Sequence, residues 1–141
     1  MTYQIVSERK LRKKIKIKHS DNVFNLLKQY AKAKQEQFIL VTLNGAHNVI
    51  SISIISIGLV NKAIIHPREI YYKAISDMAS AIIISHNHPS GNLEPSLNDK
   101  QVTNDIFQAG EIIGIPLIDH IIFSKEGYIS FKQKGMFPKE E

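Results

Sequence analysis

The chain has 141 residues, a length that fits one domain burying roughly two-thirds of its unfolded surface. Hydrophobic residues make up 43% and charged residues 22%, which excludes a disordered chain and a fibrous repeat. Because there is no cysteine, disulfides and thiolate chemistry are excluded, and any metal must be bound by His, Asp or Glu. No apolar stretch suffices for a signal peptide or a membrane span, so we expect a cytoplasmic protein without membrane contact.

The net charge of +5 comes from one segment near the N-terminus. Residues 8–19 contain seven Lys/Arg and one Glu, whereas the rest of the chain carries eleven basic and twelve acidic residues. Such a segment can bind nucleic acid or another anionic surface. Between residues 14 and 18, lysines alternate with isoleucines, which is also typical of an edge strand whose lysines deter aggregation. We therefore expect residues 1–20 to form a basic arm or an edge strand.

The first expected element after this segment is a helix that runs to about residue 34. Ser20 or Asp21 can cap its first turn through a side-chain oxygen. Apolar residues then recur at helical spacing along one face: Val23, Leu26, Leu27, Tyr30 and Ala31. This face should pack against a sheet.

Two apolar runs follow, at residues 36–43 and 48–57. The residues between them, 44–47, contain the Asn-Gly pair that favours a hairpin turn. Glu36 therefore lies at the start of a strand. If the outer edge of this hairpin is exposed, it can pair with a second copy of the chain, so a homodimer stays open.

Pro67 suits the first turn of a helix that reaches about residue 79, and residues 81–85 read as a buried strand. The strand should end at His86, and the prolines and glycine of residues 87–95 predict a loop.

Ser96 can then begin a helix that Gly110 or Gly114 closes, with Asp99 in its first turn. A second hairpin is expected from residues 117–124 and 128–131. Strands, helices and hairpins in this order predict an α/β fold, a mixed β-sheet flanked by helices.

Three residues form a candidate metal site. His86 and His88 are two residues apart, so in extended chain both imidazoles lie on the same side of the backbone. Asp99 follows eleven residues after His88, and the intervening loop can bring its carboxylate back. Catalytic zinc usually has three protein ligands and one open position. His86, His88 and Asp99 are therefore the predicted zinc ligands.

Metal-assisted hydrolysis also needs a proton acceptor outside the ligand sphere. Glu36, at a strand start, is the candidate general base. Ser96 can donate a hydrogen bond to the oxyanion of a tetrahedral intermediate. Alternatively, Ser96 only caps the helix and Asp99 only favours its N-terminus; the two roles of Ser96 are compatible.

The pattern His86-Asn87-His88, then Ser96, then Asp99 resembles the JAMM (MPN+/JAB) metalloprotease signature of His-x-His, seven residues, Ser, two residues, Asp. The segments SHNHPSGNLEPSLNDKQVT, HPREIYYKAI and GIPLIDHIIFSKEGYISF look more specifically like the JAMM domain of the bacterial RadC family. The likeness covers about residues 21–131.

This resemblance implies a cytidine-deaminase-like (JAMM/MPN) fold over residues 21–134, followed by a tail at residues 135–141. It implies zinc held by His86, His88 and Asp99, and water activated by Glu36. It further implies a peptidase or isopeptidase acting on a protein or peptide, although the RadC family was named for DNA repair. The chain is expected to be a stand-alone domain, without the helix-hairpin-helix region of longer RadC-like proteins.

Two other classes stay open. One is a nucleic-acid-associated DNA-repair or mobile-element accessory protein that binds through residues 8–19. Another is a catalytically silent interaction module, against which the intact ligand set argues. A zinc deaminase is disfavoured because those enzymes use a Cys pair. Asp119 and His120 are expected to form a buried Asp–His hydrogen bond behind the site, or to be structural, rather than to bind metal.

Overall fold

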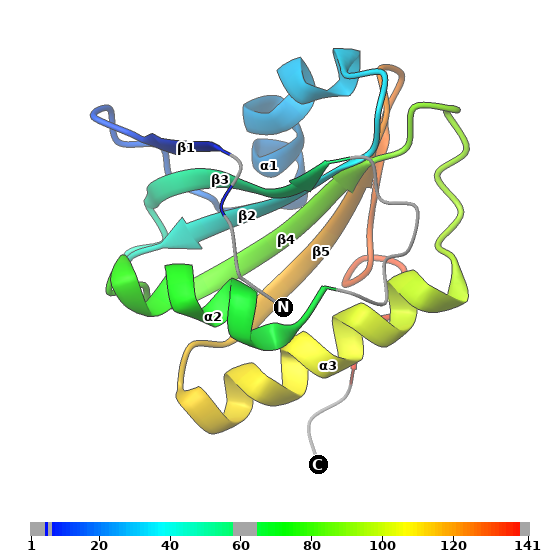
Figure 1. Cartoon of the computed structure of the whole chain (residues 1–141). Helices are drawn as coiled ribbons and strands as arrows, with labels where there is room; N and C mark the ends of the chain where they lie inside the picture. Colours follow the sequence, from blue (N-terminus) through cyan, green and yellow to red (C-terminus); the bar gives the residue numbers. More distant parts are fainter. Residues whose placement is uncertain (1–4, 6, 58–64, 139–141) are drawn as a thin grey trace.

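The computed structural model describes residue 5, residues 7–57 and residues 65–138, and the side chains of residues 56 and 57 are not considered (Figure 1). The elements in chain order are β1 (Ser7–Lys10), α1 (Ser20–Leu27), a 3₁₀ helix (Lys28–Lys32), β2 (Gln37–Leu43), β3 (Val49–Ile57), α2 (Pro67–Ser76), β4 (Ala81–Asn87), α3 (Leu97–Ile113), β5 (Leu117–Phe123) and β6 (Tyr128–Ser130). Among the described residues, no helix is both long and apolar enough to cross a bilayer.

The strands form one six-stranded sheet in the order β1-β3-β2-β4-β5-β6. The β4–β5 pair is parallel, and the other neighbours are antiparallel. Helix α3 connects the two parallel strands, as such a crossover requires. This mixed sheet agrees with the fold class expected from the sequence.

Helices cover both faces of the sheet, with α1 on one side and α2 and α3 on the other (Figure 1). Alternate residues of the central strands point to the two cores. Ile39, Val41 and Ile83 face α1, whereas Leu40, Ile82 and Ile84 face α2 and α3. Because β2 and β4 are covered on both faces, they read as continuous apolar runs.

The basic segment lies along β3. β1 pairs with residues 51–54 of β3, and the Ile15 carbonyl accepts a hydrogen bond from the Val49 N–H. Ile17 is buried while the neighbouring lysines are exposed. The outer edge of the first hairpin is therefore covered by β1 along these residues.

Three local expectations differ from the structure. The N-cap of the first helix is His19 rather than Ser20 or Asp21. The α-helix ends at Leu27 and continues as a 3₁₀ helix, which is a common ending for an α-helix. In the β2–β3 turn the left-handed residue is His47 (φ 61°), because Asn44 accepts backbone hydrogen bonds and shapes a longer loop. β4 continues to Asn87 because β2 and β5 pair with it on both sides, so His86 lies inside the strand.

Candidate metal centre

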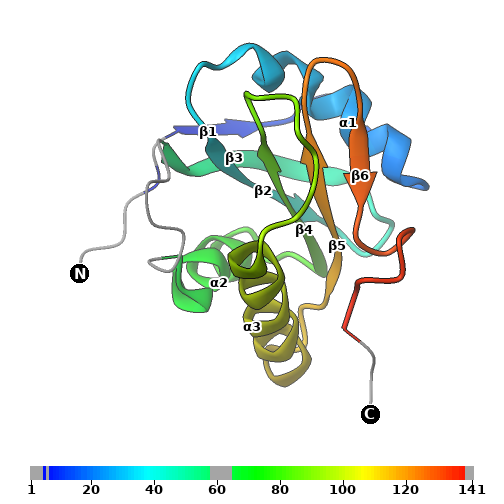
Figure 2. The same cartoon turned by 90° about the vertical axis from the view of Figure 1, so that its right-hand side faces the viewer.

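The candidate site lies where the end of β4, the residue before β2 and the first turn of α3 meet (Figure 2). β2 runs antiparallel to β4 with Phe38 opposite His86, which brings Glu36 next to the end of β4. The loop after β4 returns to start α3 at Leu97. The carboxyl ends of parallel strands are the usual location of ligand sites in α/β sheets.

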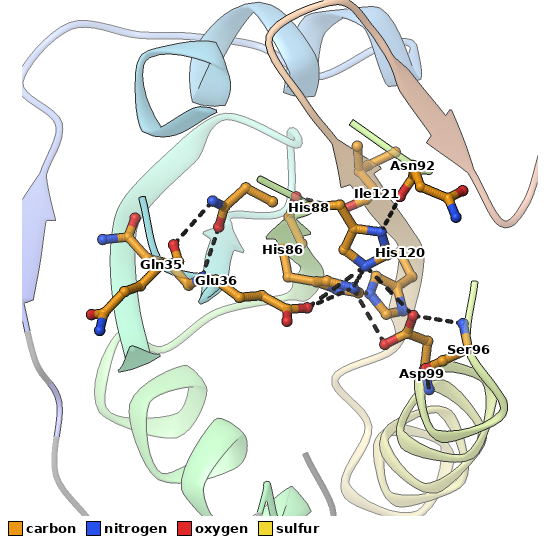
Figure 3. Close-up of polar contacts among 12 residues, drawn as sticks. Gln35, Glu36, His86, His88, Asn92, Ser96, Asp99, His120 and Ile121 are labelled. Atoms are coloured by element: carbon orange, nitrogen blue, oxygen red, sulfur yellow. Dashed lines mark hydrogen bonds and ion pairs between the residues drawn. The ribbon is translucent and has the colours of Figure 1, made fainter. Parts of the chain in front are cut away.

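Four side chains converge there, as the close-up shows (Figure 3). The Nε2 atoms of His86 and His88 are 2.9 Å apart. Asp99 Oδ1 lies 3.3 Å from the His86 Nε2, and Asp99 Oδ2 lies 3.7 Å from the His88 Nε2. Glu36 Oε1 is 3.6 Å from both Nε2 atoms. The structure therefore brings together all three predicted ligands and the predicted base.

These distances fit a divalent cation. Metal bonds of about 2.0–2.1 Å in a tetrahedron place neighbouring ligand atoms roughly 3.3 Å apart. His88 donates its Nδ1–H to the Asn92 carbonyl, 2.6 Å away, so a neutral His88 presents the lone pair of Nε2 to the cluster. Lone pairs and carboxylate oxygens that converge in this way repel one another unless a positive charge lies among them. The donor set, two imidazoles and carboxylates, suits zinc.

The two carboxylates of the cluster differ in how deeply they are buried. The side chains of His86 and Asp99 are 1% exposed, whereas those of His88 and Glu36 are 13% and 19% exposed. The cluster therefore opens toward solvent on the side of Glu36 and His88. Asp99 is thus the deeper carboxylate, and Glu36 is partly exposed as a side chain although its Oε1, which faces both histidines, is buried.

Asp99 is oriented by a reciprocal capping box at the start of α3. Ser96 Oγ accepts the Asp99 N–H at 3.0 Å, and Asp99 Oδ2 accepts the Ser96 N–H at 2.8 Å. This second bond turns Oδ1 toward His86. Ser96 is thus the N-cap of α3, and its hydroxyl hydrogen can still be donated.

Asn87 positions Glu36, a role that the sequence analysis missed. Its Oδ1 accepts the Gln37 N–H at 2.7 Å, and its Nδ2 donates to the Gln35 carbonyl at 3.2 Å. One buried amide therefore holds the backbone on both sides of Glu36. Strand alternation was the available signal, since Asn87 must point away from His86 and His88.

His120 lies directly behind His86. The His86 Nδ1 is 2.9 Å from the His120 Nε2, and the His120 Nδ1 is 2.5 Å from Thr103 Oγ1. The His120 ring also stacks on Phe131, with ring centroids 4.5 Å apart. The register of β4 and β5 explains this position. His120 pairs with Ile84, two residues before His86, so both imidazoles lie on the same face of the sheet in neighbouring strands.

The buried Asp–His hydrogen bond in the structure runs from the backbone N–H of His120 to Asp119 Oδ1, and Asp119 has the structural role that the sequence also allowed. Its carboxylate further accepts the Ser130 hydroxyl and the Lys132 N–H. Burial raises the pKa of Asp119, and the hydrogen bond from Ser130 only partly opposes this. Asp119 therefore fastens β5 to β6 and to the segment after it.

A mixed sheet flanked by helices, with a His-x-His and an aspartate gathered at the end of one strand, defines the class of JAB/MPN domains. Residues 17–136 match the family model described as the RadC-like JAB domain. The chain belongs to this family.

Similar proteins carry the name UPF0758 protein. One from Methanospirillum hungatei is 42% identical over 126 residues, covering 88% of this chain and 56% of that protein. Another from Alkaliphilus metalliredigens is 45% identical over 122 residues, covering 86% and 53%. A third from Rubrobacter xylanophilus is 43% identical over 106 residues, covering 75% and 46%. The chain thus spans about half the length of these curated relatives.

Proposed function

We propose that this chain is a zinc-dependent hydrolase that cleaves a peptide or isopeptide bond in a protein or peptide substrate. One observation carries the proposal: carboxylate oxygens of Asp99 and Glu36 lie within 3.7 Å of the Nε2 atoms of the two histidines, which face each other. Membership of the JAB-domain family supports it. His86, His88 and Asp99 would hold the metal.

Zinc in such a site polarises a carbonyl oxygen and lowers the pKa of water to about 7. Glu36 would accept the proton of the attacking water at Oε1 and later deliver it to the leaving amine. Oε1 is buried at 3.6 Å from both Nε2 atoms, while the Glu36 side chain as a whole stays partly exposed on the open side of the cluster. Asn87 would keep this carboxylate in place through the backbone of residues 35 and 37.

Ser96 would donate its hydroxyl hydrogen to the developing oxyanion. The Asp99 N–H engages one lone pair of its oxygen, so the hydroxyl hydrogen remains available for donation to another acceptor. One such donor is worth roughly 3–4 kcal/mol of transition-state stabilisation. Capping and catalysis would thus use different parts of the same hydroxyl.

Metal content and turnover test the proposal together. After removal of adventitious ions and addition of zinc, mass spectrometry should find about one zinc per wild-type chain and none in His88→Ala. On a panel of quenched peptides and isopeptide-linked conjugates, Glu36→Gln should retain zinc but lose about a hundredfold to ten-thousandfold in turnover. Glu111→Gln, an exposed change on α3, is the matched control. Absence of bound zinc, or full turnover in Glu36→Gln, would refute the proposal.

A second candidate function is nucleic-acid binding, favoured by the placement of basic residues. Arg9, Lys16 and Lys28 line one surface hollow. Lys28 also lines a hollow with Lys32 and Lys125, so the cations of residues 8–19 continue onto the 3₁₀ helix and the turn that carries Lys125. If this surface contacts phosphates, affinity for single-stranded or duplex DNA should fall steeply between about 50 and 200 mM salt. Binding that is insensitive to salt, or unchanged in Lys28→Glu, would exclude it.

A further inference from the structure

Behind the metal cluster, a line of three buried polar side chains connects α3, β5 and β4. Thr103, His120 and His86 are each at most 1% exposed. Their contacts are 2.5 Å between Thr103 and His120 and 2.9 Å between His120 and His86. Thr103 Oγ1 is also 2.8 Å from the carbonyl oxygen of Asp99, the residue that ends the ligand motif. The line therefore starts at one predicted ligand and ends on another.

Hydrogen placement along this line has two consistent solutions when both imidazoles are neutral. In the first, Thr103 donates to the Asp99 carbonyl, His120 donates its Nδ1–H to Thr103, and His86 donates its Nδ1–H to His120. The Nε2 of His86 then carries a lone pair that faces the cluster.

In the second solution every donor is reversed. Thr103 donates to the His120 Nδ1, and His120 donates its Nε2–H to the His86 Nδ1. His86 then carries its hydrogen on Nε2, directed at the cluster 2.9 Å from the His88 Nε2 and 3.3 Å from Asp99. This arrangement cannot bind a cation through His86. Changing between the two solutions moves three hydrogens and neither gains nor loses a proton.

We propose that Thr103 and His120 are positioning residues that select the His86 tautomer with a bare Nε2. This inference rests on the proposed function, since the cation is what uses that nitrogen. The Asp99 carbonyl accepts the Thr103 hydroxyl hydrogen, which leaves the Thr103 oxygen to accept from His120. Stacking on Phe131 keeps the His120 ring in the plane that both contacts require. A partner of a metal-bound histidine fixes its tautomer and orientation in this way.

Thr103→Val and Thr103→Ser form a matched pair of variants. Valine keeps the shape of threonine but cannot accept the His120 Nδ1–H, whereas serine retains the hydroxyl. Zinc affinity, measured by competition with a chromophoric chelator, should fall about tenfold or more in Thr103→Val. It should stay close to the wild-type value in Thr103→Ser. Thermal unfolding of the metal-free proteins reports whether each variant folds.

Histidine tautomers provide a readout that a merely structural role would not move. In protein labelled with ¹⁵N-histidine, long-range ¹⁵N–¹H spectra distinguish Nδ1–H from Nε2–H imidazoles. Zinc-loaded wild type should show Nδ1–H for both His86 and His120. Metal-free Thr103→Val should show Nε2–H at His120, because the valine offers no acceptor to Nδ1.

The outcomes separate this inference from the proposed function. Equal zinc affinity of wild type and Thr103→Val, or an Nε2–H His120 in the zinc-loaded wild type, would overturn the tautomer role and leave the hydrolase standing. Equal losses in the valine and serine variants would also overturn it. A wild-type chain that binds no zinc would overturn both proposals.

Discussion

Two buried polar clusters lie at opposite ends of β2, and they differ in how donors and acceptors are paired. At the Thr42 end, Lys73 on α2 contacts Glu8 and Asp77, and Asp77 accepts hydrogen bonds from Thr42 and Ser51. Each acceptor there faces a donor. At the Glu36 end, carboxylate oxygens and imidazole nitrogens face one another.

Charge explains what each arrangement is suited for. Burial alone would lower the pKa of Lys73, but hydrogen bonds to Asp77 and Glu8 outweigh it and raise the pKa. Burial would likewise raise the pKa of Asp77, whereas the hydrogen bonds from Lys73, Ser51 and Thr42 lower it. The Lys73 cluster is therefore complete within the protein and stabilises the fold. The His86 cluster instead brings two imidazole nitrogens and two carboxylates together, with no cationic Lys or Arg among the contacts described above, an arrangement suited to a bound cation.

The largest expected effect comes from removing the cation of the Lys73 cluster. Lys73→Met should lower the free energy of unfolding by about 3–5 kcal/mol, because Asp77 and Glu8 lose their buried cation. Urea unfolding measures this loss. Lys100→Met, an exposed change on α3, should shift stability by no more than about 0.5 kcal/mol. Equal stability of the two variants would show that the Lys73 cluster contributes little.

The metal cluster should behave in the opposite way. In chelator, His88→Ala should cost about 1 kcal/mol or less, the usual size for a partly exposed side chain. Zinc at a thousandfold excess over its Kd should stabilise the wild type by about 4 kcal/mol and leave His88→Ala unchanged. Thermal unfolding with and without zinc tests both statements. A large loss in chelator would mean that His88 supports the fold without metal.

Asn87 allows the base to be disturbed without touching a ligand. Asn87→Ala should lower turnover about a hundredfold, or about 2.7 kcal/mol, because the backbone around Glu36 loses both hydrogen bonds. Zinc content should stay at about one per chain. Asn92→Ala is the matched control, since it retains the backbone carbonyl that His88 contacts. Equal turnover of the two variants would contradict the positioning role of Asn87.

The pH dependence of stability gives a smaller effect than the loss of Lys73. Because the folded-state pKa of Asp77 lies below its ordinary value of 3.8, its contribution is present above that value and is lost as pH falls through the lowered pKa. Asp77→Asn should therefore cost about 1.5–3 kcal/mol at pH 7, and the gap should close in acid. Urea unfolding from pH 7 to well below 3.8 measures it. Because the pKa of Lys73 is raised, the stability that Lys73 contributes is lost only as pH rises above 10.5.

Local patterns predicted much of the site. The spacing of His86 and His88 put both rings on one side of an extended chain, and Ser96 with Asp99 carried the capping pattern that the structure contains. Asn87 and Thr103 were missed because their partners, Gln35 and His120, are distant in sequence. For Asp119 the structural alternative holds, because neighbours in a strand point to opposite faces and its carboxylate is directed away from the face that carries the His120 ring.

The sequence by itself determined the element types, the mixed α/β class and the His86, His88 and Asp99 motif, because each depends on contacts within a few residues or on local spacing. Glu36 was a candidate from its strand start and the family resemblance, but tertiary structure alone decided that Glu36 and His120 lie beside that motif. The antiparallel register that sets Phe38 opposite His86 brings Glu36 there. The parallel register of β4 and β5 brings His120 there. These two pairings join strands that no tight turn connects, so their order and register depend on packing the two cores.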